Sequence, residues 1–190
     1  MANLPGGAFA KGRDRIVRVA DPGGIRQECT VSAGAITLPS GLSYNFLKGA
    51  TRAEFTPSPA SQEFYLLGDN GWRDSVGITQ AGELSCAAFF INSVASDGTA
   101  EADIDPALQL VLNAESDPDV EVWVEMFTLL GQDDSSNFIY HSRAFQGCVM
   151  NVSETGTADA LIEYTWTFSS RGEVWAGLYD AGASALDVYG

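Results

Sequence analysis

The sequence predicts a mostly β protein: an antiparallel β-sandwich or barrel with one short α-helix and an extended N-terminal arm. Apolar and polar residues alternate with a period of two in the last third of the chain, which is typical of half-buried strands. Turn residues separate these short strand-like segments. With 190 residues, 45% of them hydrophobic, the chain is long enough to bury one core and too apolar to be mostly disordered.

The first sixty residues differ from the rest because proline and glycine divide them into short pieces. We expect brief strands at residues 16–19 and 27–38, joined by long loops. Residues 1–60 are therefore predicted to form an arm and loops that belong to the same domain as a sandwich body at residues 61–190. The sequence contains no internal repeat that would indicate a second domain.

The middle of the chain predicts consecutive strands. Residues 62–67 and 76–80 are expected to pair around the turn Asp69-Asn70-Gly71, because this residue combination favours tight hairpins. Ala81-Gly82 is interpreted as a second turn, which leads into a strand at residues 83–92.

One segment, residues 103–116, departs from the β pattern. Asp105 is placed to cap a helix, and Pro106 fits the first turn, where no amide donor is needed. Four apolar residues then share one helical face: Ala107, Leu108, Val111 and Leu112. Alternating leucines within residues 108–112 leave a strand as the alternative, and the capping residues favour the helix.

The last third of the chain predicts a meander of antiparallel strands. The expected strands are residues 119–128, 137–152, 158–168 and 173–178. Polar turns at residues 131–136, 155–157 and 170–172 separate them. Several short strands with turns between them indicate a sandwich or a barrel.

The charge of the chain is strongly negative and unevenly distributed. Lys and Arg number 10 against 25 Asp and Glu, a formal net charge of −15. Because most of the basic side chains precede residue 53, we predict that residues 1–26 contact the acidic body of an adjacent copy. The arm candidates are Lys11, Arg13, Arg15, Arg18 and Arg26. The alternative is that these side chains pair within their own subunit.

One predicted strand carries an acidic stripe. Along residues 119–128, Asp119, Glu121 and Glu125 share a face, with Trp123 between them. The simplest interpretation is a solvated sheet face. The second is a wall that an anionic polymer passes without adhering. An outward Trp123 would be either a platform for stacking sugars or a contact with a neighbouring subunit.

Residues for catalysis or metal binding are scarce. His141 is the only histidine, no GxSxG motif is present, and the three cysteines lack metal-ligand spacing and are interpreted as reduced. Glu121 and Glu125 lie about 13 Å apart along one strand, whereas glycosidases need about 5–9.5 Å between their carboxyl groups. We therefore predict that the chain is not an enzyme and has neither a metal nor a cofactor.

Membranes and nucleic acids are also disfavoured as specific partners. No apolar run reaches the roughly 18 residues that cross a bilayer, and residues 1–10 lack the pattern of a secretory signal. An acidic body repels phosphate, which argues against tight binding to DNA or to an anionic membrane. We expect a protein that is made inside a cell and has no membrane partner.

The second half of the chain contains a distinctive succession of strands and turns. Residues 145–149 (FQGCV) lead through a polar turn to residues 159–168, which end at the turn Arg171-Gly172. This succession resembles the closing strands of phage tail tube (major tail) proteins. Residues 67–72 (LGDNGW) are similar to the earlier half of that family, as is a helix between β segments. The resemblance covers residues 62–178 and consists of strand and turn patterns.

The resemblance implies a non-enzymatic structural virion protein that self-assembles into hexameric rings stacked into a tube. One sheet of each subunit would line a lumen through which DNA passes without specific binding. The lumen-facing candidates are Asp119, Glu121 and Glu125. The resemblance also implies other tail proteins as partners at the tube ends, and a location in the virion tail after assembly in the host cytoplasm.

Two other classes of protein compete with this interpretation. A carbohydrate-binding or adhesin module would expose Trp72, Trp123 or Trp175 as stacking platforms. Another virion part, such as a tail terminator or connector, would share the sandwich and stop at a single ring. Polymer length and sugar binding distinguish these classes.

Overall fold

The computed structural model describes residues 15–65, 73–90, 92–94, 100–117, 119–156 and 161–186. In chain order the elements are β1 (Arg15–Ala20), β2 (Thr30–Ser32), β3 (Ala35–Thr37), β4 (Tyr44–Phe46), β5 (Ala50–Tyr65), β6 (Arg73–Phe89), β7 (Asn92–Val94), β8 (Ala100–Ile104), α1 (Pro106–Glu115), β9 (Val122–Gln132), β10 (Phe138–Thr155), β11 (Glu163–Ser170) and β12 (Trp175–Asp180). Ten strands form one sheet, and β7 pairs with β8. The fold is mostly β with one short helix, as the sequence predicts.

The long strand β10 joins two halves of the large sheet. One edge of β10 pairs with β9 as far as Gly147, and its other edge pairs first with β12 and then, from Gly147 onward, with β11. A Cβ added to Gly147 would lie 2.2 Å from the carbonyl oxygen of Ser169, so only glycine fits where the partner changes. We call β4, β1, β9, residues 138–147, β12, β3 and β2 the first half-sheet. The second half-sheet consists of residues 147–155, β11, β6 and β5.

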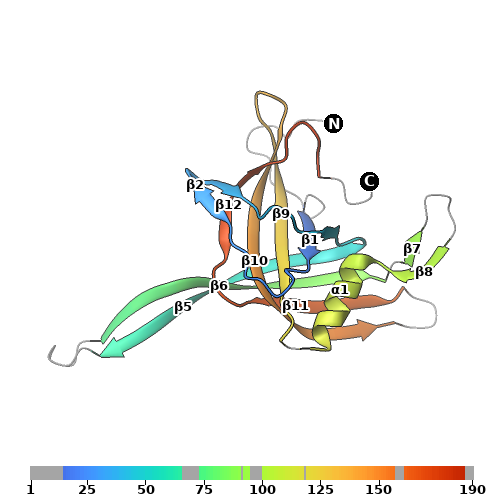
Figure 1. Cartoon of the computed structure of the whole chain (residues 1–190), viewed down its shortest axis with the longest axis horizontal. Coiled ribbons are helices and arrows are strands. Elements are labelled where there is room, and N and C mark those ends of the chain that lie inside the picture. The colour runs from blue at the N-terminus through green and yellow to red at the C-terminus, as the bar shows by residue number, and fades with distance from the viewer. Residues whose placement is uncertain are drawn as a thin grey trace.

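The two half-sheets run in different directions and enclose the core. In Figure 1, β9 and β10 run up the picture, whereas β5, β6 and β11 run across it. Within the described residues the end strands β2 and β5 do not pair, so the sheet is open rather than closed into a barrel. The core lies between Val17 and Val124 of the first half-sheet and Leu84 and Trp166 of the second. Burial of such side chains stabilises the fold by about 1.5–3 kcal/mol each.

The helix α1 covers one end of this core. Its buried side chains are Ala107, Leu108, Val111 and Ala114, which share one face at helical spacing. Asp105 occupies the N-cap position and Pro106 the first turn, as predicted, although the Asp105 side chain makes no capping hydrogen bond. Among the described residues, no helix is long and apolar enough to cross a membrane.

A second, smaller apolar cluster covers the other face of the first half-sheet. Ala20, Trp123 and Ala144 pack there under Ile36 and Leu38, which come from the segment that contains β2 and β3. Strand β9 is therefore buried on both faces from Val122 to Phe127. Such a strand has no solvated face, although its sequence alternates.

The structure also tests the predicted elements one by one. The strand predicted at residues 16–19 is confirmed as β1, which lies in the sheet between β4 and β9 rather than reaching away from the body. The turn predicted at Ala81-Gly82 is wrong, because both residues lie inside β6. A Cβ added to Gly82 would meet the Phe55 ring at 2.2 Å, so this glycine makes room for an aromatic ring. The Asp69-Asn70-Gly71 turn lies outside the described residues.

Candidate assembly surfaces

The outer face of the second half-sheet is polar and acidic. Strand register places three carboxylates, Glu54, Glu83 and Glu163, on this face. The serine and threonine side chains beside them are Thr56, Ser85, Ser153, Thr155, Thr165, Thr167 and Ser169. The register also places Arg52, Ala87, Phe89, Cys148 and Met150 there. We call this surface the polar outer face; its inner side carries the core residues Leu84, Trp166 and Phe168.

Both lateral edges of the second half-sheet are unpaired in the part of the chain that the structure describes. Strand β5 ends the order of strands on one side. On the other side, β9 stops pairing at Gly147, which leaves residues 148–155 of β10 with β11 as their one partner strand. Exposed edges of this length are templates for pairing with another chain.

The hairpin of β5 and β6 extends beyond the second half-sheet. From Ser58 opposite Ala81 to Tyr65 opposite Arg73, its two strands pair with each other, and among the described strands with no other. Figure 1 shows this part of the hairpin projecting from the body. A two-stranded ribbon is marginally stable by itself in water, so a projecting one is suited to packing on another molecule.

The acidic stripe predicted on β9 is divided by the structure. Glu125 has no exposed surface: it pairs with Arg18 and accepts a hydrogen bond of 2.7 Å from Trp123 Nε1. A side chain without exposed surface cannot line a lumen, so the prediction is wrong for Glu125. Asp119 is exposed and Glu121 half-buried, and their place at a lumen stays a prediction. Trp123 is fully buried, so it is neither a sugar platform nor a surface contact.

Aromatic rings surround the buried Arg18–Glu125 pair. The Arg18 guanidinium lies 3.9 Å from the centre of the Tyr44 ring and 5.0 Å from that of Phe127. Burial, and then the charge of Glu125, raise the pKa of Tyr44. Burial, with Glu125 and Glu173, also raises the pKa of the Cys29 thiol to about 12, which keeps it protonated. The alternation of residues 119–128 carries no signal that this carboxylate is internal.

The basic arm candidates are used in different ways. Lys11 and Arg13 lie outside the described residues. Arg15 donates a hydrogen bond of 2.6 Å from Nη1 to the Ala53 carbonyl, and Arg18 pairs with Glu125. Arg26 lines a groove of about 650 Å³ together with Asp119 and Glu121. Arg18 pairs within its own subunit, which is the alternative that the sequence leaves open for the basic side chains. Contacts of residues 1–26 with another copy stay a prediction.

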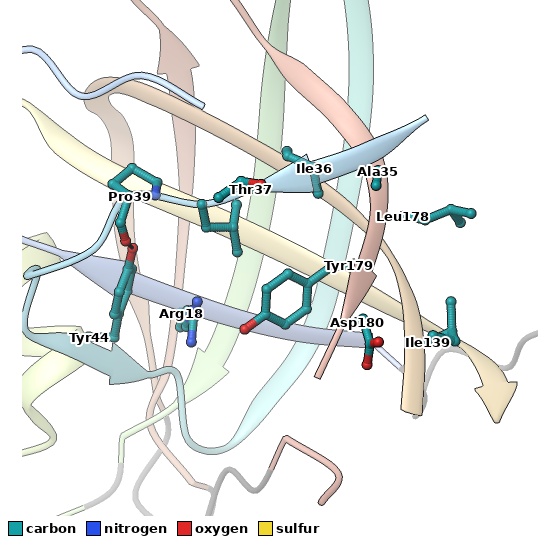
Figure 2. Close-up of a pocket in the computed structure, with 11 residues that line it drawn as sticks. Arg18, Ala35, Ile36, Thr37, Pro39, Tyr44, Ile139, Leu178, Tyr179 and Asp180 are labelled. Carbon is teal, nitrogen blue, oxygen red and sulfur yellow. Dashed lines mark hydrogen bonds between the residues drawn. The ribbon is translucent and has the colours of Figure 1, made fainter. Parts of the chain in front are cut away.

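One groove of about 770 Å³ in the described part of the molecule is mostly apolar (Figure 2). It is lined by Ile36, Pro39 and Ile139, with Arg18 between Tyr44 and Tyr179 in the view of Figure 2. Because Arg18 already pairs with Glu125, the groove does not present a free cation to a ligand.

The described residues contain no group of three or more His, Cys, Asp or Glu side chains that could hold a metal ion. His141 lies on β10 beside Arg143, and burial, followed by the charge of Arg143, lowers its pKa. The histidine is therefore neutral at neutral pH. The expectation that the chain is not an enzyme stays a prediction.

Comparisons with known proteins give structural matches alone. No family model matches the chain, and no curated protein matches it. One similar solved structure is a chain in the tail of an empty GTA particle with C6 symmetry, at 16% identity and a TM-score of 0.44, covering 88% of this chain and 98% of that one. Another is a chain of the six-fold symmetrised anti-feeding prophage baseplate, at 8% identity and a TM-score of 0.41, covering 94% and 99%.

Proposed function

We propose that this chain is a structural component of a phage-type tail that self-assembles into rings stacked into a tube. The observation that carries the proposal is the second half-sheet, which combines a polar, acidic outer face with two unpaired edges. The strand and turn resemblance of residues 62–178 to tail tube proteins supports it independently.

Ring closure follows from pairing unlike edges. If the β5 edge of one copy pairs with residues 148–155 of the next, the contact is heterologous and repeats around a ring. Each contact then covers one edge from each copy, so a closed ring exposes neither. Six copies per ring is the number that the sequence resemblance implies.

The polar outer face is the wall of the proposed conduit. Joined side by side, these faces form a continuous surface on which hydroxyl groups and carboxylates predominate. Because phosphate is repelled by carboxylates, DNA passes such a wall without specific binding. Asp119 and Glu121 remain candidates for its rim, since Glu121 Oε1 lies 3.8 Å from Nη1 of Arg171, directly after β11.

The projecting part of the β5–β6 hairpin is the proposed contact between stacked rings. It extends away from the body and lacks a partner strand among the described residues. Other tail proteins at the tube ends, a location in the virion tail and assembly in the host cytoplasm complete the proposal. A sugar-binding module finds less support, because the buried Trp123 offers no stacking platform.

Negative-stain electron microscopy of the purified chain over a range of concentrations, with light scattering, tests the proposal. We expect hollow filaments of uniform width. In a variant that replaces residues 59–80 with a tight Asn-Gly turn, we expect single rings, because the edges remain and the ring-to-ring contact is lost. A full-length chain that stays monomeric at every concentration contradicts the proposal.

A further inference from the structure

Two arginines and the neutral His141 lie together on the inner side of the first half-sheet. Arg15 and His141 both lie opposite Thr128, on either side of it, and Arg143 follows two residues after His141 on the same face of β10. Arg15 is exposed, and His141 and Arg143 are half-buried, so all three are accessible. We call Arg15 and Arg143 the basic patch, beside which His141 lies.

The patch borders the unpaired edge of the second half-sheet. The Arg143 guanidinium lies 4.8 Å from the centre of the Phe55 ring on β5, and Arg15 donates a hydrogen bond to the Ala53 carbonyl of the same strand. Phe55 and Ala53 lie on the inner side of β5, against the core. The positive charges of Arg15 and Arg143 therefore lie beside the unpaired edge of β5. If another strand paired with this edge, its inner-side residues would face these two charges.

Within the described part of the chain, neither Arg15 nor Arg143 has a carboxylate within ion-pair distance. Burial, and then the positive charge of Arg15, lower the pKa of Arg143. Arg18 and Arg171, in contrast, both have carboxylate partners. In a chain with 25 acidic residues, uncompensated guanidinium groups on an accessible face are suited to receiving a carboxylate from outside.

We propose that the basic patch receives Glu154 of a second copy of this chain, and that this ion pair sets the register between neighbouring subunits. The inference rests on the edge-to-edge pairing proposed above. Glu154 lies on the unpaired part of β10, and its register opposite Tyr164 places it on the inner side of its strand. When residues 148–155 of one copy lie beside β5 of the next, the inner sides of both strands coincide, so Glu154 faces Arg143 and Arg15.

The side chain of Glu154 is accessible and oriented for this contact. It is exposed, and its Oε2 accepts a hydrogen bond of 2.6 Å from the Tyr164 hydroxyl. Among the described residues, Oε1 has no hydrogen-bond partner. Tyr164 therefore orients the carboxylate while one oxygen remains for a guanidinium. A charge pair across a strand interface also disfavours other registers, because a shifted strand leaves both charges unpaired.

A charge-swap experiment tests the inference by sedimentation velocity at low and high salt. We expect Glu154→Arg and Arg143→Glu each to weaken self-association at least about tenfold, because like charges then meet across the interface. The double variant E154R/R143E restores the opposite charges and is expected to recover most of the association. Glu28→Arg is the matched control, since Glu28 is exposed and lies outside the second half-sheet, and it should associate like the wild-type chain.

The outcomes separate this inference from the proposed function. A wild-type chain that is monomeric throughout contradicts both. If the wild type assembles and E154R assembles equally well, the inference fails while the tube proposal stands. If R143E blocks assembly and E154R does not, Glu154 is the wrong partner. Unfolding midpoints of each variant, measured by circular dichroism, identify any loss of association caused by misfolding.

Discussion

Two regions of the molecule carry carboxylates on strands and use them in opposite ways. In the first half-sheet, Glu125 is fully buried and binds Arg18 and Trp123. In the second half-sheet, the carboxylates of the polar outer face stand among serine and threonine side chains and contact solvent. Glutamate on a strand therefore makes a structural ion pair in the first half-sheet and is a surface charge in the second.

The difference depends on what covers the second face of each half-sheet. The segment that contains β2 and β3 packs over β9, so both faces of that strand are buried. In the part of the chain that the structure describes, no such segment packs on the polar outer face. A buried carboxylate persists only with a charge partner and hydrogen bonds, which is the role of Arg18 and Trp123. An exposed carboxylate needs neither and remains available to act on a partner.

The largest effect is expected from breaking the buried pair. Glu125→Ala leaves Arg18 almost buried without a counter-charge and leaves Trp123 Nε1 without its acceptor, so we expect a loss of about 3–5 kcal/mol in the free energy of unfolding. Urea denaturation followed by tryptophan fluorescence measures it. Glu83→Ala, on the polar outer face, is the matched control and should change stability by less than about 0.5 kcal/mol.

A double variant sharpens the same contrast. Arg18→Met with Glu125→Leu removes both charges and keeps apolar volume, so it is expected to be more stable than Glu125→Ala alone. Equal midpoints for Glu125→Ala and Glu83→Ala would show that the buried pair contributes nothing and that the two regions do not differ.

The next effect is expected at the junction of the two regions. In Gly147→Ala the new methyl group would lie 2.2 Å from the Ser169 carbonyl oxygen, so β10 and β11 must separate there, at a cost of about 1–3 kcal/mol. Gly156→Ala is the control, because its new methyl group meets the side-chain carbon Cγ1 of Ile162 at 3.2 Å, and that side chain can move. Thermal unfolding compares the two. A Gly147→Ala variant as stable as the control would mean that the half-sheets are not held together at this point.

These contrasts also mark the limit of what the sequence predicts. The β class, the helix with Asp105 and Pro106, and the strand of Trp166 and Phe168 follow from local periodicity and capping residues, which act within one element. Alternation on β9 predicts which side chains share a face, and this is correct. It does not predict that Glu125 lies under residues more than eighty positions earlier, because coverage of a face is a long-range property.

Glycine shows the same limit. The sequence predicts a turn at Ala81-Gly82, since local reasoning assigns glycine to turns. The structure gives Gly82 a different role, as the space that the Phe55 ring occupies, and this requires the partner strand to be known. The basic patch likewise arises from strands β1 and β10, which lie far apart in the sequence and are both neighbours of β9.

A smaller effect on stability is expected at Asp105, a buried carboxylate that is less completely hydrogen-bonded than Glu125. Its Oδ2 is buried without a hydrogen-bond partner, and burial raises its pKa. A raised carboxyl pKa in the folded state means that stability is lost as the pH rises through the ordinary Asp range to the folded value. Asp105→Asn removes the charge and keeps a side chain that suits the N-cap, so we expect a gain of about 1 kcal/mol at pH 7.

The gain from Asp105→Asn should shrink as the pH falls through the raised folded pKa of Asp105, and vanish below the ordinary Asp value of about 3.9, where the wild-type carboxyl is protonated in both states. Thermal unfolding at pH 7 and at pH 4 measures this trend. A variant that is less stable than the wild type at pH 7 would show that the Asp105 charge stabilises α1, and that Asp105 belongs with Glu125 as a satisfied buried group.

The smallest effect on stability, and the one closest to function, is expected on the polar outer face. Replacing its three carboxylates with lysine (E54K/E83K/E163K) should change the unfolding midpoint little, because exposed substitutions usually cost less than about 0.5 kcal/mol each. Glu54 and Glu83 are exposed, and the half-buried Glu163 loses one hydrogen bond of 2.8 Å from Thr51 Oγ1. If this face lines a conduit, filaments of the variant should retain short duplex DNA at low salt and release it at high salt, whereas wild-type filaments should retain none. The control E28K/D134K/E173K adds the same charge at exposed positions outside the second half-sheet. Equal retention by both variants would mean that net charge alone determines DNA binding, and would remove the reason for placing this face at the lumen.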